Sequence, residues 1–266
     1  MNDDPGSGDA AGPRTPSPLA RHVLTRIRLA ASFLTILPVA PADPAEPADI
    51  AASFGWFPLV GFVLGAALCA LDWSLAPILH PALRAVIVVA ALTAVTGAVH
   101  LDGLADTADA LGAGRDRARA LEILRDSRIG SFGAVALIFI LTLKFVAIAA
   151  ADPADRRRAL ILAPGLGRWA MVAVSAGMDY LRPGGAGSAL LDQERGGSNP
   201  RLATIIGLIG VAVFAVHRLL AAIVAAAALT FAMRVFYRRW LGGITGDLIG
   251  AAGEIVETAV LIALTC

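Results

Sequence analysis

The chain has 266 residues, of which 57% are hydrophobic and only 16% are charged. Soluble domains carry about 25% charged residues, so this composition predicts a protein embedded in a membrane rather than a soluble domain. The formal net charge of +1 provides no strong field for a polyanion, and we expect no nucleic-acid partner.

The N-terminal segment, residues 1–18, is rich in Pro, Gly and Asp and lacks the basic start and apolar core of a secretory signal. We expect it to be a disordered tail. Residues 19–266 are then predicted to form one integral-membrane catalytic domain. Its first part, residues 19–37, places basic side chains among apolar ones at helical spacing, which predicts a helix lying at the membrane surface.

Several apolar runs follow, each near the roughly 20 residues that a helix needs to cross the hydrocarbon layer. Residues 203–235 form a longer apolar stretch that is interrupted by His217 and Arg218, and it is either one helix or two helices folded back at that pair. The predicted fold is all-α, a polytopic transmembrane bundle of about 6–7 spans plus the N-terminal interfacial helix. The other expected spans cover residues 54–79, 83–101, 132–151, 159–178 and 249–265.

Three hydrophilic segments separate these runs: residues 102–131, 179–202 and 237–248. Short cytoplasmic loops carry an excess of Lys and Arg, and the first segment contains five arginines and the third contains two. If residues 203–235 are a pair of helices, all three segments lie on the cytoplasmic face. The second segment is rich in glycine and is expected to be a mobile loop.

The first hydrophilic segment begins within HLDGLADTADAL, residues 100–111. On a helix, Asp106 lies about 40° and Asp109 about 20° from Asp102, so the three carboxylates share one face. A Mg²⁺ ion between them would relieve their repulsion, because Mg²⁺ is commonly held by one or two carboxylates together with substrate phosphates. The alternative is a solvated acidic helix start.

The string LEILRDSRIGSFG, residues 121–133, is a short basic and glycine-containing entry to the next span. Free backbone N–H groups at a helix start and a guanidinium fork can both bind phosphate. Arg125 and Arg128 are therefore candidate contacts to a substrate phosphate. The alternative is ordinary ion pairing along a helix surface.

Two cations fall inside the predicted spans. Lys144 lies near the middle of residues 132–151 and marks either a functional site or a buried ion pair. Arg168 follows Pro164 and two glycines, which would allow a helix break within the membrane where protein or water surrounds it. Both cations are candidates for phosphate binding.

A second acidic string, GGITGDLIGAAGEIVETAVL, spans residues 242–261. Glu254 lies about 20° and Glu257 about 80° from Asp247 on a helical wheel, so an acidic face enters a span. The glycines of this string allow close helix packing or close approach to a ligand. Two acidic faces together with basic residues predict a metal-assisted phosphoryl-transfer site.

Several strings resemble, in order, the motifs of the cobalamin synthase family, the adenosylcobinamide-GDP ribazoletransferases; they include FLTILPV, GWFPLVGFVLGA, HLDGLADTADAL, GRWAMV and GGITGDLIGAAGEIVETAVLIAL. The resemblance implies an enzyme of the bacterial inner membrane whose active site faces the cytoplasm. It implies that adenosylcobinamide-GDP is joined to α-ribazole or its 5′-phosphate with release of GMP. It also implies dependence on Mg²⁺ and contact with membrane lipid, and leaves the oligomeric state open, a homo-oligomer included.

The resemblance also suggests roles for individual residues. Metal ligation would fall to the carboxylates of Asp102, Asp106, Asp109 and Asp247, with Glu254 a further acidic catalytic residue. Phosphate contacts would come from Arg125, Arg128, Lys144 and Arg168.

Two other functions remain open. A lipid enzyme like the CDP-alcohol phosphotransferases should carry an Asp before Asp102 and an Ala-Arg pair after Gly103, and the sequence has neither at the expected spacing. A cation-coupled transporter would use Lys144, Glu254 and Glu257 as an intramembrane relay. Such a transporter should also show an internal repeat, and no repeat is visible in the sequence.

Overall fold

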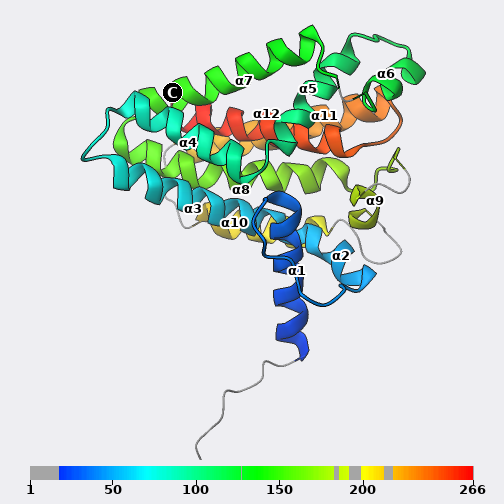
Figure 1. Cartoon of the computed structure of the whole chain (residues 1–266), viewed down its shortest axis with the longest axis horizontal. Helices are drawn as coiled ribbons and strands as arrows, with labels where there is room; N and C mark the ends of the chain where they lie inside the picture. The colour runs from blue at the N-terminus through cyan, green and yellow to red at the C-terminus, as the bar shows by residue number, and fades with distance from the viewer. Residues whose placement is uncertain (1–17, 127, 183–185, 192–198, 213–217, 266) are drawn as a thin grey trace, which may run out of the picture.

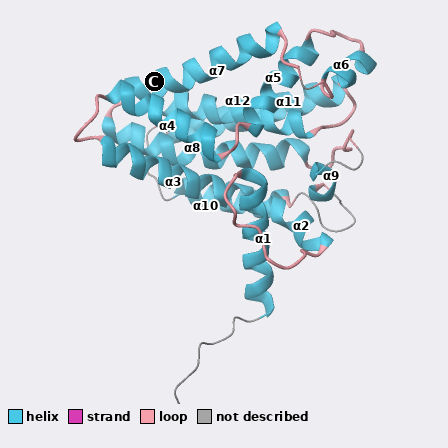
Figure 2. Cartoon of the chain, viewed as in Figure 1, coloured by secondary structure: helices cyan, strands magenta, loops and turns pink. Residues whose placement is uncertain are grey.

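The computed structural model describes residues 18–126, 128–182, 186–191, 199–212 and 218–265, and it is mostly helical over these ranges (Figure 1, Figure 2). No strand occurs among the described residues, and their isolated β-type contact joins Tyr180 to Ile244. The predicted all-α class is confirmed. The expected N-terminal tail lies outside the described residues except for Pro18.

Most of the long helices lie along the long axis of a bundle, whereas α1 projects across it (Figure 1). The elements in chain order are α1 (Pro18–Leu34), α2 (Pro47–Ser53), the 3-10 turn η1 (Phe54–Trp56), α3 (Phe57–Leu75), α4 (Pro81–Val95), α5 (Val99–Leu111), α6 (Arg117–Ile123), α7 (Ser131–Ala150), α8 (Pro153–Ser175), α9 (Ala186–Leu190), α10 (Pro200–Ala212), α11 (Leu219–Trp240) and α12 (Gly246–Thr265).

Four helical segments within the described ranges are long and apolar enough to cross a membrane: Pro47–Leu75, α7, α11 and α12. The pair α4 and α5, bent by 88°, makes a fifth if it counts as one span. The sequence predicted about 6–7 spans. The difference lies in α8, which begins with charged residues, and in α10, which has only 13 residues.

The long apolar stretch of residues 203–235 is divided between α10 and α11, so it forms two helices. The predicted turn at His217 lies outside the described residues, and Arg218 directly precedes α11. Because the stretch is split, the chain returns to the end of the bundle where α5 ends. The two acidic strings can share one site only if the chain returns to this end.

The outer faces of the bundle are apolar. Large hydrophobic side chains are exposed along α7 and α11, among them Ile138, Phe139, Leu143, Leu220, Val224 and Phe231. A soluble monomer rarely exposes apolar patches larger than a few hundred Å². Together with the apolar helices, this surface identifies an integral membrane protein.

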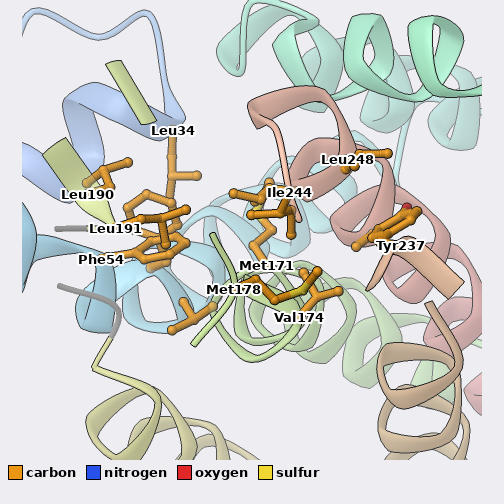
Figure 3. Close-up of a cluster of buried hydrophobic side chains, with 14 of the residues drawn as sticks. Leu34, Phe54, Met171, Val174, Met178, Leu190, Leu191, Tyr237, Ile244 and Leu248 are labelled. Carbon is orange, nitrogen blue, oxygen red and sulfur yellow. The ribbon is translucent and has the colours of Figure 1, made fainter. Parts of the chain in front are cut away.

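Helix α8 is the centre of the bundle and contributes buried side chains along its whole length. Buried side chains around its C-terminal half pack with α1, η1 and the end of α11 (Figure 3). Those around its N-terminal half pack with α3, α4, α7 and α12. The possible break at Pro164 does not occur: the helix continues through it, and α3 packs directly on this part of α8 at Gly61.

The end of the bundle opposite α5 is closed by a buried ion pair. Arg156 of α8 donates to Asp72 of α3 over 2.6 Å, and Arg84 of α4 lies 3.4 Å from the same carboxylate. Arg156 is 2% exposed. A buried charge is tolerated when it is paired, and this pair joins three helices.

Gly65 on α3 lies where α3 touches the backbone of α8, and a Cβ there would sit 2.6 Å from the carbonyl oxygens of Leu160 and Ile161. We expect Gly65→Val to destabilise the protein by about 1–3 kcal/mol, because the helices must separate. Thermal unfolding in a fixed detergent measures the loss. Gly207→Ala on α10 is the matched control, since its Cβ would lie an ordinary 3.5 Å from Trp169. Equal unfolding temperatures for the two variants would contradict this packing.

Candidate functional site

Helix α5, which carries the first acidic string, begins after a sharp break in the chain. Gly97 and Ala98 both have positive φ angles, of 61° and 56°. A non-glycine residue in this left-handed conformation costs of order 1–2 kcal/mol, so packing must hold Ala98 there. The predicted span 83–101 is therefore corrected: α4 ends at Val95 and HLDG lies inside α5, because a residue pair that the sequence reading passed over turns the chain.

Helices α5 and α12 approach each other with no side chain between them. A Cβ on Gly103 would lie 2.9 Å from the Cα of Asp247, and a Cβ on Gly250 would lie 3.2 Å from the Cα of His100. One glycine from each helix thus permits the contact. The fold brings together the two acidic strings that the sequence analysis assigned to one site.

The carboxylates of this site repel one another. The charges of Asp102, Asp109 and Asp247 all act on Asp106. Among the described residues, the Asp102 and Asp106 side chains have neither a hydrogen-bond partner nor an ion-pair partner. We call Asp102, Asp106 and Asp247 the acidic cluster. Its negative charge, which Arg182 offsets only in part, favours a bound cation.

Asp109 has a different environment from the other three. Its carboxylate accepts hydrogen bonds from the backbone N–H groups of Gly130, over 2.7 Å, and Gly133, over 2.9 Å. These are N–H groups at the start of α7, which have no partner within their own helix. Asp109 therefore caps α7 and holds it against α5, and its role as a metal ligand stays a prediction.

The carboxylates of the acidic cluster fit a magnesium ion only as an open site. No three carboxylate, histidine or thiol groups within the described ranges are arranged closely enough to enclose a metal ion by themselves. Magnesium usually keeps several waters and binds one or two carboxylates plus substrate phosphates. The hard oxygen donors of Asp102 and Asp106, which have no described partner, are consistent with such an open magnesium site.

Arg182 reaches the acidic cluster, although the sequence analysis did not single it out. Its Nη1 lies 3.8 Å from Oδ2 of Asp247, and its Nη2 donates to the carbonyl oxygen of Leu124 over 2.7 Å. Nearby, burial raises the pKa of the Tyr180 hydroxyl and the charge of Asp247 raises it further, so this hydroxyl keeps its proton. The sequence contained one indication of this role, because Arg182 is a basic residue in a segment that is expected to lie on the same cytoplasmic face as the acidic strings.

The three hydrophilic segments meet at this end of the bundle, as predicted. Trp240 donates its indole N–H to the carbonyl oxygen of Gly114 over 3.0 Å. Ile244 exchanges backbone hydrogen bonds with Asp179 and Leu181, each over 2.9 Å. Within the expected mobile loop, residues 183–185 and 192–198 lie outside the described residues.

Arg125 and Arg128 lie between α6 and α7 at the same end of the chain's fold, and both are exposed. Arg128 forms a forked contact to Asp126, with Nη2 2.6 Å from Oδ2, and these hydrogen bonds lower the pKa of Asp126 to about 2. The Arg128 side chain is still 86% exposed. Their predicted contact with phosphate stays a prediction.

Lys144, Arg168, Glu254 and Glu257 come together in a buried network inside the bundle. Lys144 donates to Glu254 over 2.6 Å and to Glu257 over 2.5 Å, and Arg168 pairs with the other oxygen of Glu257. None of the four is more than 4% exposed. Of the two interpretations of Lys144, the structure shows the buried ion pair. Since both cations already have carboxylate partners, the arrangement lends no support to the prediction that they bind phosphate, or to a catalytic Glu254.

A pocket adjoins the acidic cluster. It has a volume of about 210 Å³ and includes Asp102 and Asp247 in its polar wall and Leu34, Phe54 and Met171 in its apolar wall. Figure 3 shows Leu34 and Phe54 close together on one side of the buried cluster, with Met171 farther along it. The site thus combines a charged region with a small apolar chamber.

Known proteins are similar to this chain over most of its length. The family model described as cobalamin-5-phosphate synthase matches residues 26–265. The chain is 42% identical over 243 residues to an adenosylcobinamide-GDP ribazoletransferase of Syntrophobacter fumaroxidans, covering 89% of this chain and 96% of the relative. It is 43% identical to the protein of the same name in Stutzerimonas stutzeri, with the same coverage. No solved structure matches the chain.

The buried network can be tested through stability. Lys144→Met leaves Glu254 without a cation in a dry interior, so we expect the variant to lose about 3–5 kcal/mol of unfolding free energy. Adding Glu254→Gln removes that unpaired charge, and the double variant should recover part of the loss. Unfolding midpoints in a fixed detergent compare the two. A double variant no more stable than the single one would argue against this pairing.

Proposed function

The chain belongs to the cobalamin-5-phosphate synthase family, and from that premise we propose that the acidic cluster between α5 and α12 is its active site. The protein is a transferase of cobalamin biosynthesis that uses adenosylcobinamide-GDP and a ribazole-type acceptor. The observation that carries the site is the glycine-mediated contact that sets Asp102 and Asp106 beside Asp247.

In the reaction, a ribose hydroxyl of the acceptor attacks the phosphorus attached to the cobinamide side chain. A new phosphorus–oxygen bond forms and the hydroxyl proton is released to solvent, while the bond to the bridging oxygen of the diphosphate breaks and GMP leaves with that electron pair. The chain's task is mainly to position the two substrates and to stabilise negative charge on the phosphates. α-Ribazole and its 5′-phosphate both present such a hydroxyl.

The acidic cluster would hold Mg²⁺, with Asp102, Asp106 and Asp247 as the candidate ligands. A bound ion would neutralise the negative charge of the diphosphate. Arg182 stands beside Asp247 and presents its guanidinium to the same region, which suits an oxygen of the departing phosphate. The exposed Arg125 and Arg128 are further contacts that a diphosphate can recruit.

We further propose that the protein lies in the bacterial cytoplasmic membrane, with the acidic end facing the cytoplasm. Basic residues in short loops favour the cytoplasmic side. Arg115, Arg117, Arg119, Arg238 and Arg239 all lie at or next to the end that carries the acidic cluster. Lipid would then cover the apolar faces of α7 and α11, and association into a homo-oligomer stays a prediction.

The two alternative functions find less support. An intramembrane relay needs groups that exchange partners with an ion or water, whereas Lys144 and Glu257 are fully engaged in buried ion pairs. Three relatives that are 36–43% identical to the chain carry the name of a ribazoletransferase and not that of a lipid phosphotransferase or a transporter.

The activity is tested with purified protein in detergent. With adenosylcobinamide-GDP, α-ribazole and Mg²⁺ we expect release of GMP, and removal of Mg²⁺ by a chelator should abolish it. Asp106→Asn and Asp247→Asn should each lower kcat at least about 100-fold, because metal binding contributes several kcal/mol to such reactions. Asp43→Asn, on an exposed loop, is the matched control. Full Mg²⁺-dependent turnover by Asp106→Asn would refute the assignment.

The orientation is tested by labelling single cysteines with a membrane-impermeant maleimide, after Cys69 and Cys266 are replaced by Ser. Arg115→Cys and Arg239→Cys, both at exposed positions near the acidic end, should react in inverted membrane vesicles and not in intact cells. Ala76→Cys, at an exposed position in the connection between α3 and α4 at the other end, should show the opposite pattern. Labelling of all three from one side would exclude this topology.

A further inference from the structure

The pocket beside the acidic cluster is built to hold something small and largely apolar. Its volume is about 210 Å³, below the about 300–1,000 Å³ of clefts that take drug-sized ligands. Aromatic and aliphatic side chains from α1, η1, α3 and α8 form most of its wall, and polar groups are confined to the side next to α5 and α12. These wall residues include Phe33, Leu34, Phe54, Phe57 and Met171.

His100 is the unusual group in this wall. It is 6% exposed, and its Nδ1 has no hydrogen-bond partner among the described residues. Leaving a buried polar group unpaired costs about 1–3 kcal/mol, so native structures usually satisfy such groups. The two other histidines that the structure describes both have partners. His22 contacts the carboxylate of Asp49, and His80 accepts a hydrogen bond from the backbone N–H of Ala82.

His100, with its unpaired nitrogen, lies next to the proposed reaction centre. The residue precedes Asp102 by less than one turn of α5, and both line the pocket together with Asp247. The backbone of His100 is fixed against α12 by the contact with Gly250. A ligand held by this imidazole would therefore lie directly beside the acidic cluster.

The chemistry of the pocket distinguishes the ring systems of the two substrates; this step rests on the proposed function. A corrin ring is too large for a chamber of this volume. A purine carries several hydrogen-bond donors and acceptors around its edge, and an apolar wall would leave most of them unpaired. The azole base of a ribazole has a flat aromatic surface and one free ring nitrogen, which matches an aromatic wall with one unpaired hydrogen-bonding group.

We propose that this pocket binds the aromatic azole base of the ribazole acceptor, and that His100 donates a hydrogen bond from its ring N–H to the free ring nitrogen of that base. The base is then held between Phe54 and Met171 and the start of α5. The ribose attached to it extends toward Asp102 and Asp247, where its hydroxyl meets the diphosphate. His100 is thus an acceptor-binding residue, distinct from the groups that hold the metal.

Two substitutions of His100 separate hydrogen bonding from packing. His100→Leu removes the donor and should raise KM for α-ribazole about five- to tenfold, as expected for one lost hydrogen bond. His100→Asn places an amide N–H near the position of Nδ1 and should show less than half of that effect. KM for adenosylcobinamide-GDP should stay unchanged in both. His80→Leu and His80→Asn, at the start of α4, are the matched controls.

An independent test fills the pocket from another helix and does not need turnover. Gly246 lines the pocket, and a Cβ there would contact only the Tyr180 hydroxyl, at 3.6 Å, so a larger side chain enters open space. Benzimidazole serves as the probe and should bind the wild-type protein in equilibrium dialysis and compete with α-ribazole. Gly246→Leu should weaken this binding at least about tenfold, with an unfolding temperature close to that of the wild type.

The outcomes distinguish a failure of the proposed function from a failure of the proposed base-binding pocket. A wild-type protein that releases no GMP contradicts the proposed function, whereas benzimidazole binding still reports on the pocket. An active enzyme in which His100→Leu or Gly246→Leu raises KM for adenosylcobinamide-GDP alone overturns the assignment, because the pocket then belongs to the other substrate. Benzimidazole binding that is unaffected by Gly246→Leu overturns it as well.

Discussion

The direct contact between the backbones of α5 and α12 is the constraint on which the site depends. Gly103 and Gly250 leave no room for a side chain between the helices, so Asp102 and Asp106 are held beside Asp247. Holding three carboxylates this close together is unfavourable, because their negative charges repel one another. Packing over the rest of the two helices must offset it, and a bound cation would remove it.

The charged side chains have different environments in the interior of the bundle and at its α5 end. In the interior, Lys144 and Arg168 are matched with Glu254 and Glu257, and at the far end Arg156 is matched with Asp72. Such pairs are required where water cannot solvate an isolated ion. At the α5 end, by contrast, Asp102 and Asp106 have no described partner. This contrast supports the proposal that the acidic cluster is the site, whereas the buried network is part of the scaffold.

The sequence was sufficient for the fold class, for most helices and for the acidic strings, because hydrophobic runs and helical spacing are local signals. It was insufficient where contacts between distant segments decide. The break at Gly97 and Ala98 depends on packing, and Asp109 proved to cap α7 through Gly130 and Gly133, a contact that spacing along one helix cannot reveal. The sequence did not indicate a role for Arg182 or His100, because neither residue is part of a regular pattern of charged residues.

The buried network and the pocket are neighbours, which gives the network an indirect part in the site. The charges of Arg168, Glu257 and Lys144 all act on His100, which itself lines the pocket. Arg168 retains two guanidinium nitrogens without a hydrogen-bond partner among the described residues. Any shift of this network would therefore change the surroundings of His100 before it reached the acidic cluster. The buried network thus acts on one residue of the pocket wall through its charges, although none of its own four side chains lines the pocket.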